Sequence, residues 1–171
     1  MDLSDTLKKF KNGEISLNEV QMHLKVAGFE DLSGIAKLDI HRAKRTGIPE
    51  AVIADCKTCD DVVSIARVQL KNEGRSIITR TSDEKYAALC VLAEEMGVYI
   101  RWSERARVAV LGAAAKKTGG RVGIISAGTA DIPVAEEAKE IAVEMGCTVT
   151  ALYDVGVAGI HRLFPELGKL V

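Results

Sequence analysis

Aromatic residues are scarce in this chain, and long hydrophobic runs are missing from it. Phe, Trp and Tyr make up 4% of the 171 residues, whereas Val, Ile and Ala are frequent, a balance that fits an α/β core better than an all-β one. No apolar stretch approaches the ~18–20 residues that cross a membrane, and no apolar signal-peptide segment follows the first methionine. We therefore expect a cytoplasmic protein that does not bind a membrane.

The chain also has no excess of positive or negative charge. The chain has 23 Lys and Arg residues against 24 Asp and Glu residues, which leaves a formal net charge of −1. Nucleic-acid-binding surfaces are basic, so we expect no nucleic-acid partner. The length allows one ordinary domain or two small ones.

Two capped helices are predicted first, over residues 5–12 and 17–27. Each follows a serine that can cap it, and the second has a capping box of Ser16 and Glu19. Glycines follow both segments and favour their ends. Two such helices bury little apolar surface alone, so we expect residues 1–30 to form a helical arm that packs on a neighbour.

The middle of the chain alternates strand and helix signals. Short β-branched runs bounded by turn residues predict strands, and capped segments with apolar residues three and four apart predict helices. Strands are expected over 35–40, 51–54, 76–79, 98–102 and 107–111, and helices over 60–72 and from a capping box of Thr81 and Glu84 to Met96. This pattern is typical of a small α/β or α+β domain, which we place at residues 31–115.

The Gly- and Ala-rich segment 112–120 is the best linker and predicts a domain boundary. The residues after it predict a strand over 122–125, a helix over 132–145 ended by Gly146, a strand over 148–153 and a last helical piece over 157–167. One βαβ unit cannot cover both faces of a parallel sheet. We therefore expect residues 120–171 to be part of a parallel-sheet domain that other chains or further sequence complete.

The turn SAGTAD, residues 126–131, is the first candidate site. It joins a buried strand to a helix start, where unpaired backbone N–H groups and the helix dipole favour an anion. Thr129 and Asp131 are also ordinary residues of a capped helix start, so a purely structural turn stays open.

A second turn follows the last predicted strand and carries polar side chains. Asp154 has two interpretations: it caps this turn, or it acts as a base or a base-orienting group. His161 likewise has either a structural role or an acid–base role. Arg162 suits a phosphate or carboxylate, which a guanidinium binds bidentately. Both turns follow strand C-termini, where open α/β sheets bind their ligands.

The chain also contains a CxxC spacing at Cys56 and Cys59. Such a pair occurs in redox sites and in zinc sites. Zinc would need two further ligands, and Cys90 and Cys147 lie in apolar segments. We therefore expect structural cysteines and predict no metal-binding residues.

Four segments resemble the LarB family of nickel-pincer cofactor biosynthesis, in the order expected for that family. They are LDIHRAKRTGIPEAVIADCKT (38–58), ITRTSDEKY (78–86), SAGTADIPVAEEA (126–138) and YDVGVAGIHRLF (153–164). The C-terminal domain of LarB resembles PurE, the aminoimidazole ribonucleotide carboxylase. The resemblance thus implies a small N-terminal α/β domain followed by the first βαβ part of a PurE-like parallel-sheet domain.

The resemblance also implies a reaction. LarB carboxylates C5 of the pyridinium ring of nicotinic acid adenine dinucleotide with CO₂ or bicarbonate. Hydrolysis of the phosphoanhydride then gives pyridinium-3,5-biscarboxylate mononucleotide and AMP. Because a pyridinium ring is electron-poor, a thiolate must first add to it. In the family this cysteine belongs to a C-terminal portion, so we expect a truncated, homo-oligomeric LarB that is inactive alone.

Site residues follow from the same resemblance. Asp131 is assigned to ribose hydroxyls or to orienting its turn, because its charge does not favour a phosphate. The implied catalytic residues are Asp154 and His161, and the implied substrate-binding residues are Ser126, Gly128, Thr129, Asp131, Arg162, Arg42, Arg45, Lys57 and Arg80. The last four also fit a solvated basic face or contacts to a neighbouring subunit. Mg²⁺ is kept as a candidate cofactor.

Two other functions stay open. One is a carboxylase of purine synthesis that acts on aminoimidazole ribonucleotide, which the long N-terminal region and the altered turn disfavour. The other is a non-catalytic nucleotide-binding or assembly module.

Overall fold

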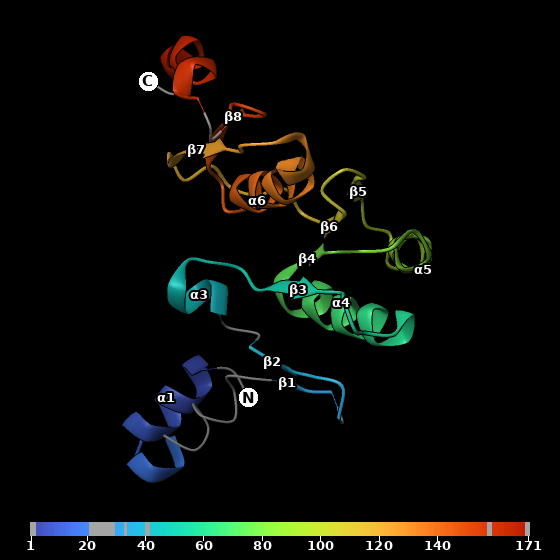
Figure 1. Ribbon diagram of the computed structural model, residues 1–171. Coiled ribbons are helices and arrows are strands. Elements are labelled where there is room, and N and C mark those ends of the chain that lie inside the picture. The colour runs from blue at the N-terminus through green and yellow to red at the C-terminus, as the bar shows by residue number, and fades with distance from the viewer. Residues whose placement is uncertain (1–2, 21–29, 33, 40–41, 157–158, 170–171) are drawn as a thin grey trace. The chain divides into compact units, whose positions relative to one another are not determined.

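The protein forms two compact units, Met1–Ile48 and Pro49–Val171, which are described separately. The computed structural model describes residues 3–20, 30–32, 34–39, 42–156 and 159–169 (Figure 1). The second unit combines helices with a mixed sheet and a parallel strand pair. This arrangement confirms the predicted α/β class.

The first unit contains short elements. Helix α1 spans Leu3–Lys11, and residues 17–20 are helical after the predicted capping box. In that box the Ser16 N–H donates to Glu19 Oε2 at 2.7 Å, and the Glu19 N–H donates to Ser16 Oγ at 3.2 Å. Residues 21–27 of the second predicted helix lie outside the described residues.

Three further elements of this unit depart from the sequence prediction. Strand β1 (Glu30–Asp31) pairs antiparallel with β2 (Lys37–Leu38), and α3 (Arg42–Thr46) follows. The strand expected over 35–40 is thus shorter, and neither β1 nor α3 was predicted. Elements of two to five residues are too short to show a period of their own.

A four-stranded sheet is the centre of the second unit, with the order β3–β4–β6–β5. β3 and β4 are parallel, and the other neighbours are antiparallel. The strands are β3 (Ala51–Ile53), β4 (Arg75–Thr79), β5 (Ile100–Ser103) and β6 (Val108–Gly112), all close to the predicted bounds.

Helices α4 (Cys59–Glu73) and α5 (Asp83–Met96) pack with this sheet. Thr58 caps α4, and Ser82 caps α5 by accepting the Lys85 N–H at 3.3 Å. The predicted capping box of Thr81 and Glu84 is therefore wrong by one residue. The largest fully buried side chains of this unit are Ile65, Ile77, Ile78, Leu89, Leu92 and Leu111.

The predicted βαβ part follows. β7 (Arg121–Ile125) and β8 (Thr148–Leu152) pair in parallel, and α6 (Ile132–Glu144) packs on them (Figure 1). A short 3₁₀ turn, η1 (Thr129–Asp131), leads into α6. The last helical piece is not an α-helix but two 3₁₀ segments, η2 (Ile160–Arg162) and η3 (Phe164–Lys169).

The segment predicted as a linker lies inside the second unit. The Ala113 N–H donates to the Gly74 carbonyl at 3.1 Å, and the Thr118 N–H donates to the Gly146 carbonyl at 2.9 Å. These bonds tie the segment to the ends of α4 and α6. The structure divides into its two compact units at residues 48–49, and the domain boundary predicted at residues 112–120 stays a prediction.

The parallel strand pair leads to a first prediction, that the 171-residue chain self-associates. Parallel strands are normally covered on both faces, yet alternate residues of β7 are exposed and the Ile125 side chain is 48% exposed. Sedimentation at micromolar concentration should show a dimer or larger species. Ile125→Lys should shift it toward the monomer, whereas a monomeric parent chain would contradict the prediction.

Candidate functional site

The turns that follow β7 and β8 lie side by side. The Ser126 N–H donates to the Leu152 carbonyl at 2.9 Å, and the Val155 N–H donates back to the Ser126 carbonyl at 3.2 Å. The Gly156 N–H donates to the Ala127 carbonyl at 2.8 Å. The structure therefore brings the two turns nominated by the sequence to one edge, at the carboxyl ends of parallel strands.

The turn after β7 combines a helix start with an unsatisfied hydroxyl. Ser126 is 6% exposed, and its Oγ has no hydrogen-bond partner among the described residues. The first N–H groups of a helical segment, here those of Thr129 and Ala130, have no acceptor within it. A buried polar group without a partner calls for a ligand or a water molecule. The turn thus offers donors to an anion.

Asp131 has a local role in the same turn. Its Oδ2 accepts the Gly128 N–H at 2.9 Å. The Gly128 N–H is therefore occupied by the protein itself, and Asp131 orders the turn. This contact supports the orienting role among the two that the sequence left open for Asp131.

The turn after β8 holds the polar side chains on its surface. Asp154 has a left-handed backbone with φ 55°, and Arg162 Nη1 donates to its carbonyl oxygen at 3.2 Å and lies 3.4 Å from its Oδ1. A methyl group on Gly156 would come within 2.5–2.9 Å of the Arg162 guanidinium. The arginine end is flexible and can shift, so it is the positive φ of 73° that favours glycine at position 156.

The His161 ring also lies close to a glycine of this turn, Gly159. A methyl group on Gly159 would overlap the His161 ring, and His161 is exposed. The Arg162 and His161 side chains thus each lie against a glycine of this turn.

The predicted basic residues are more dispersed. Arg80 follows β4 with φ 53°, and its guanidinium lies 3.7 Å from Asp55 Oδ2 and 3.5 Å from Glu137 Oε1 on α6. Lys57 is half-buried in the loop between β3 and α4. Arg42 is exposed on α3 in the first unit, and the side chain of Arg45 lies outside the described part. Their contacts to a substrate stay predictions.

A cluster of Tyr153, Glu136 and Lys139, here called the tyrosine cluster, was not predicted. The Tyr153 hydroxyl donates to Glu136 Oε1 at 2.5 Å, and Lys139 Nζ lies 3.0 Å from Glu136 Oε2. Burial and then the Glu136 carboxylate raise the pKa of Tyr153. Burial would also raise the pKa of Glu136, but the hydrogen bonds from Tyr153 and Lys139 outweigh it and lower that pKa.

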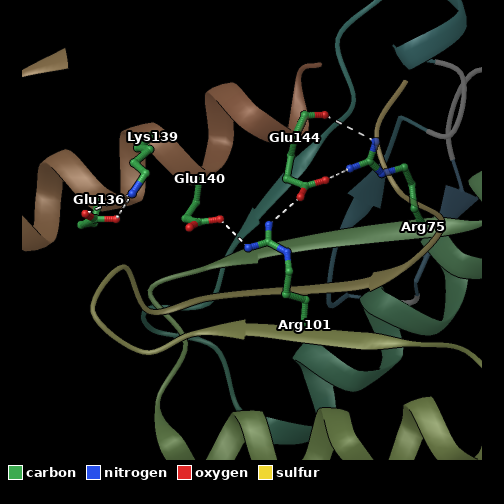
Figure 2. Close-up of polar contacts among 6 residues, drawn as sticks. All are labelled: Arg75, Arg101, Glu136, Lys139, Glu140 and Glu144. Carbon is green, nitrogen blue, oxygen red and sulfur yellow. Dashed lines mark hydrogen bonds and ion pairs between the residues drawn. The ribbon is translucent and has the colours of Figure 1, made fainter. Parts of the chain in front are cut away.

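Further along α6, two glutamates meet arginines of the four-stranded sheet (Figure 2). Arg101 on β5 lies 2.6 Å from both Glu140 Oε2 and Glu144 Oε1. Arg75 on β4 pairs with the other oxygen of Glu144, whose side chain is 7% exposed. Burial would lower the pKa of Arg101, but its two carboxylate partners outweigh burial and raise it. These pairs join the helix of the anion turn to the sheet.

The cysteines and metal ligands give no further site. All four cysteines are free thiols, and none of them lies on either turn. Partial burial and then the Glu84 carboxylate raise the pKa of Cys59, which favours its uncharged thiol. The described residues contain no group of three or more His, Cys, Asp or Glu side chains arranged to bind a metal. Mg²⁺ as a cofactor stays a prediction.

Sequence comparisons show the family of the chain. Residues 29–113 match the family described as the LarB/PurE-like N-terminal domain. The chain is 37% identical over 174 residues to an uncharacterized protein of Methanocaldococcus jannaschii, and the match covers 99% of this chain and 68% of that relative. The chain therefore belongs to the LarB/PurE-like family, which is enzymatic in general. None of the helices in the described part is long and apolar enough to cross a membrane.

Proposed function

We propose that the protein is a LarB-type pyridinium-3,5-biscarboxylic acid mononucleotide synthase of nickel-pincer cofactor biosynthesis. In this proposal C5 of the pyridinium ring of nicotinic acid adenine dinucleotide takes up CO₂ or bicarbonate carbon, and water cleaves the phosphoanhydride to release AMP. The observation that carries the proposal is the pairing of the two turns, with the unsatisfied Ser126 hydroxyl beside the start of α6.

The turn after β7 is proposed to bind a phosphate of the dinucleotide. The Ser126 hydroxyl and the N–H groups of Thr129 and Ala130 donate to phosphate oxygens, and the helix dipole adds to their attraction. Arg162, which folds over the neighbouring Gly156, supplies a positive charge from the second turn. Mg²⁺ is a proposed cofactor, held by phosphate oxygens of the dinucleotide together with one or two carboxylates.

The proposed chemistry needs a nucleophile and a base. A thiolate adds to the pyridinium ring, and the resulting dihydropyridine attacks the CO₂ carbon through C5. Asp154 then takes the proton from C5, the ring electrons restore the pyridinium, and the thiolate leaves. His161, on the same turn, is proposed to assist proton transfer.

The thiolate is not supplied by the two turns. Cys56 and Cys59 lie in and just after the loop following β3, Cys90 lies on α5, and Cys147 directly precedes β8, at the end opposite the two turns. In this proposal the 171-residue chain binds the dinucleotide and provides the base, and a group outside the turns adds to the ring. We therefore expect this chain to bind the substrate without carboxylating it.

Calorimetry of the 171-residue chain tests the proposal. Nicotinic acid adenine dinucleotide should bind more tightly than AMP, nicotinic acid mononucleotide or aminoimidazole ribonucleotide, because only the dinucleotide fills both turns. Tighter binding of aminoimidazole ribonucleotide would favour the purine carboxylase instead. No binding of the dinucleotide at millimolar concentration would refute the proposal. Mass spectrometry after incubation with bicarbonate should show no dicarboxylated mononucleotide, and turnover would mean that a residue of this chain is the nucleophile.

Two substitutions in the second turn test which of its side chains binds the dinucleotide. Arg162→Ala should weaken dinucleotide binding about 10- to 100-fold, the usual scale for a hydrogen bond between charged groups. The loss should be partial because the helix start still binds part of the phosphate. His161→Asn, the matched control on the adjacent residue, should bind as the parent does. If Arg162→Ala bound the dinucleotide as tightly as the parent does, the guanidinium would not touch the substrate.

A further inference from the structure

We propose that the tyrosine cluster is a positioning device that fixes the Asp154 turn relative to helix α6. Tyr153 is the residue directly before Asp154, and Glu136 lies in the second turn of α6. Their hydrogen bond spans 17 residues of sequence and joins the end of β8 to the helix that the anion turn opens. The inference rests on the proposed function only for the role given to Asp154.

The turn needs such a contact because its backbone is strained. Asp154 has φ 55°, a left-handed conformation that costs a residue with a side chain roughly 1–2 kcal/mol. Two backbone bonds hold the residues that follow, those of the Val155 and Gly156 N–H groups to the turn after β7. The Tyr153 hydroxyl adds a third link, on the preceding residue. Together the three links hold the strained residue from both sides.

Glu136 is suited to this role and not to that of a base. Its side chain is 13% exposed, and its two oxygens already accept from Tyr153 and Lys139. The hydrogen bonds from Tyr153 and from Lys139, three residues along the same helix, lower the pKa of Glu136 and keep it a charged, strong acceptor. An occupied, mostly buried carboxylate cannot reach a substrate proton. Tyr153, Glu136 and Lys139 are thus positioning residues.

Amide hydrogen exchange of the ligand-free 171-residue chain tests the inference. Tyr153→Phe removes only the hydroxyl and should speed the exchange of the Val155 and Gly156 amides at least about tenfold, because these bonds then open locally. The exchange rates of the β7 and β8 amides should change less than about twofold. Tyr99→Phe is the matched control, since Tyr99 is 74% exposed. It should change the exchange rates neither of the Val155 and Gly156 amides nor of the β7 and β8 amides.

Variants of the acceptor supply a rescue test. Glu136→Ala should behave as Tyr153→Phe does, whereas Glu136→Gln keeps an oxygen acceptor and should restore protection to within about threefold of the parent. Unchanged exchange at Val155 and Gly156 in Tyr153→Phe would overturn the inference. A uniform rise along β7 and β8 would also overturn it, because that would mark a general loss of stability. So would a failure of Glu136→Gln to rescue, because an acceptor oxygen at position 136 would then not protect the turn.

The same variants separate this inference from the proposed function. Exchange is measured without ligand and therefore decides the positioning role on its own. Calorimetry with nicotinic acid adenine dinucleotide decides the proposed function in the parent chain. A parent that fails to bind the dinucleotide refutes the function, while the exchange of Val155 and Gly156 still supports or overturns the role of Tyr153.

Discussion

Glu144→Gln is expected to lower the free energy of unfolding by about 3 kcal/mol, the scale for breaking a buried ion pair from one side. One Glu144 oxygen accepts from Arg101 at 2.6 Å, and the other pairs with Arg75 (Figure 2). The Glu144 and Arg75 side chains are only 7% and 15% exposed. A neutral amide would leave Arg75 without its carboxylate partner and Arg101 with Glu140 alone, and it would turn an N–H₂ group toward one of the two guanidinium groups.

Urea unfolding followed by fluorescence measures this loss. Trp102 is the one tryptophan of the sequence, and it lies on β5 beside Arg101 with its ring stacked on Tyr86 at 4.6 Å. Its signal therefore reports on the sheet that the arginines belong to.

An exposed ion pair of the same length is the control. Arg67 and Glu95 also lie 2.6 Å apart, but their side chains are 39% and 52% exposed. Glu95→Gln should therefore lose less than about 1 kcal/mol. Equal losses in the two variants would mean that the pairs on α6 are no stronger than surface pairs. The attachment of α6 to the sheet would then depend on apolar contacts such as that of Ile141 with the core around Ile77.

The elements that could be predicted are those fixed by local chemistry. Helices α4, α5 and α6 end within two residues of a glycine with positive φ, as the sequence indicated at Gly74, Gly97 and Gly146. The β-branched runs of β4 and β7 likewise lie within one residue of their predicted bounds. Caps, glycines and short apolar runs act through neighbours in sequence, so the sequence alone is enough to find them.

The cap of α5 shows where local reasoning fails. Thr81 and Ser82 are adjacent hydroxyl residues, and either can cap a helix. A distant residue decides between them, because the Thr81 N–H donates to the Arg107 carbonyl and Arg107 Nε donates back to the Thr81 carbonyl. These bonds hold Thr81 beside β6 and leave Ser82 as the cap.

The candidate site also has features that the sequence predicts and features that depend on distant residues. The pairing of the two turns could be predicted, because parallel strands end at one edge of a sheet. The tyrosine cluster and the pairs of Arg101 could not, since they join residues 17 to 43 positions apart. They depend on which face of α6 meets the sheet. Glu136, Glu140 and Glu144 recur every four residues on one helix face, and that spacing was the signal available in the sequence.

Gly112→Ala is expected to destabilise the second unit by about 3 kcal/mol, as the sum of backbone strain and overpacking. Gly112 ends β6 with φ 86°, where a side chain is disfavoured. An added methyl group would overlap the Gly74 carbonyl oxygen and lie 3.0 Å from Leu70 Cδ2. The Gly74 carbonyl cannot turn away without loss, because it accepts the Ala113 N–H at 3.1 Å.

Gly97→Ala separates the cost of backbone strain from the cost of overpacking. Gly97 also has a positive φ, 62°, but no described atom lies within 4 Å of a methyl group placed there. It should therefore cost only the backbone strain, about 1 kcal/mol. Urea unfolding of both variants, read by Trp102 fluorescence, should show the larger loss for Gly112→Ala. Equal losses would contradict the prediction, because they would mean that the end of α4 moves to accept the methyl group. The contact between Gly74 and Gly112 would then not fix the register of β4 and β6.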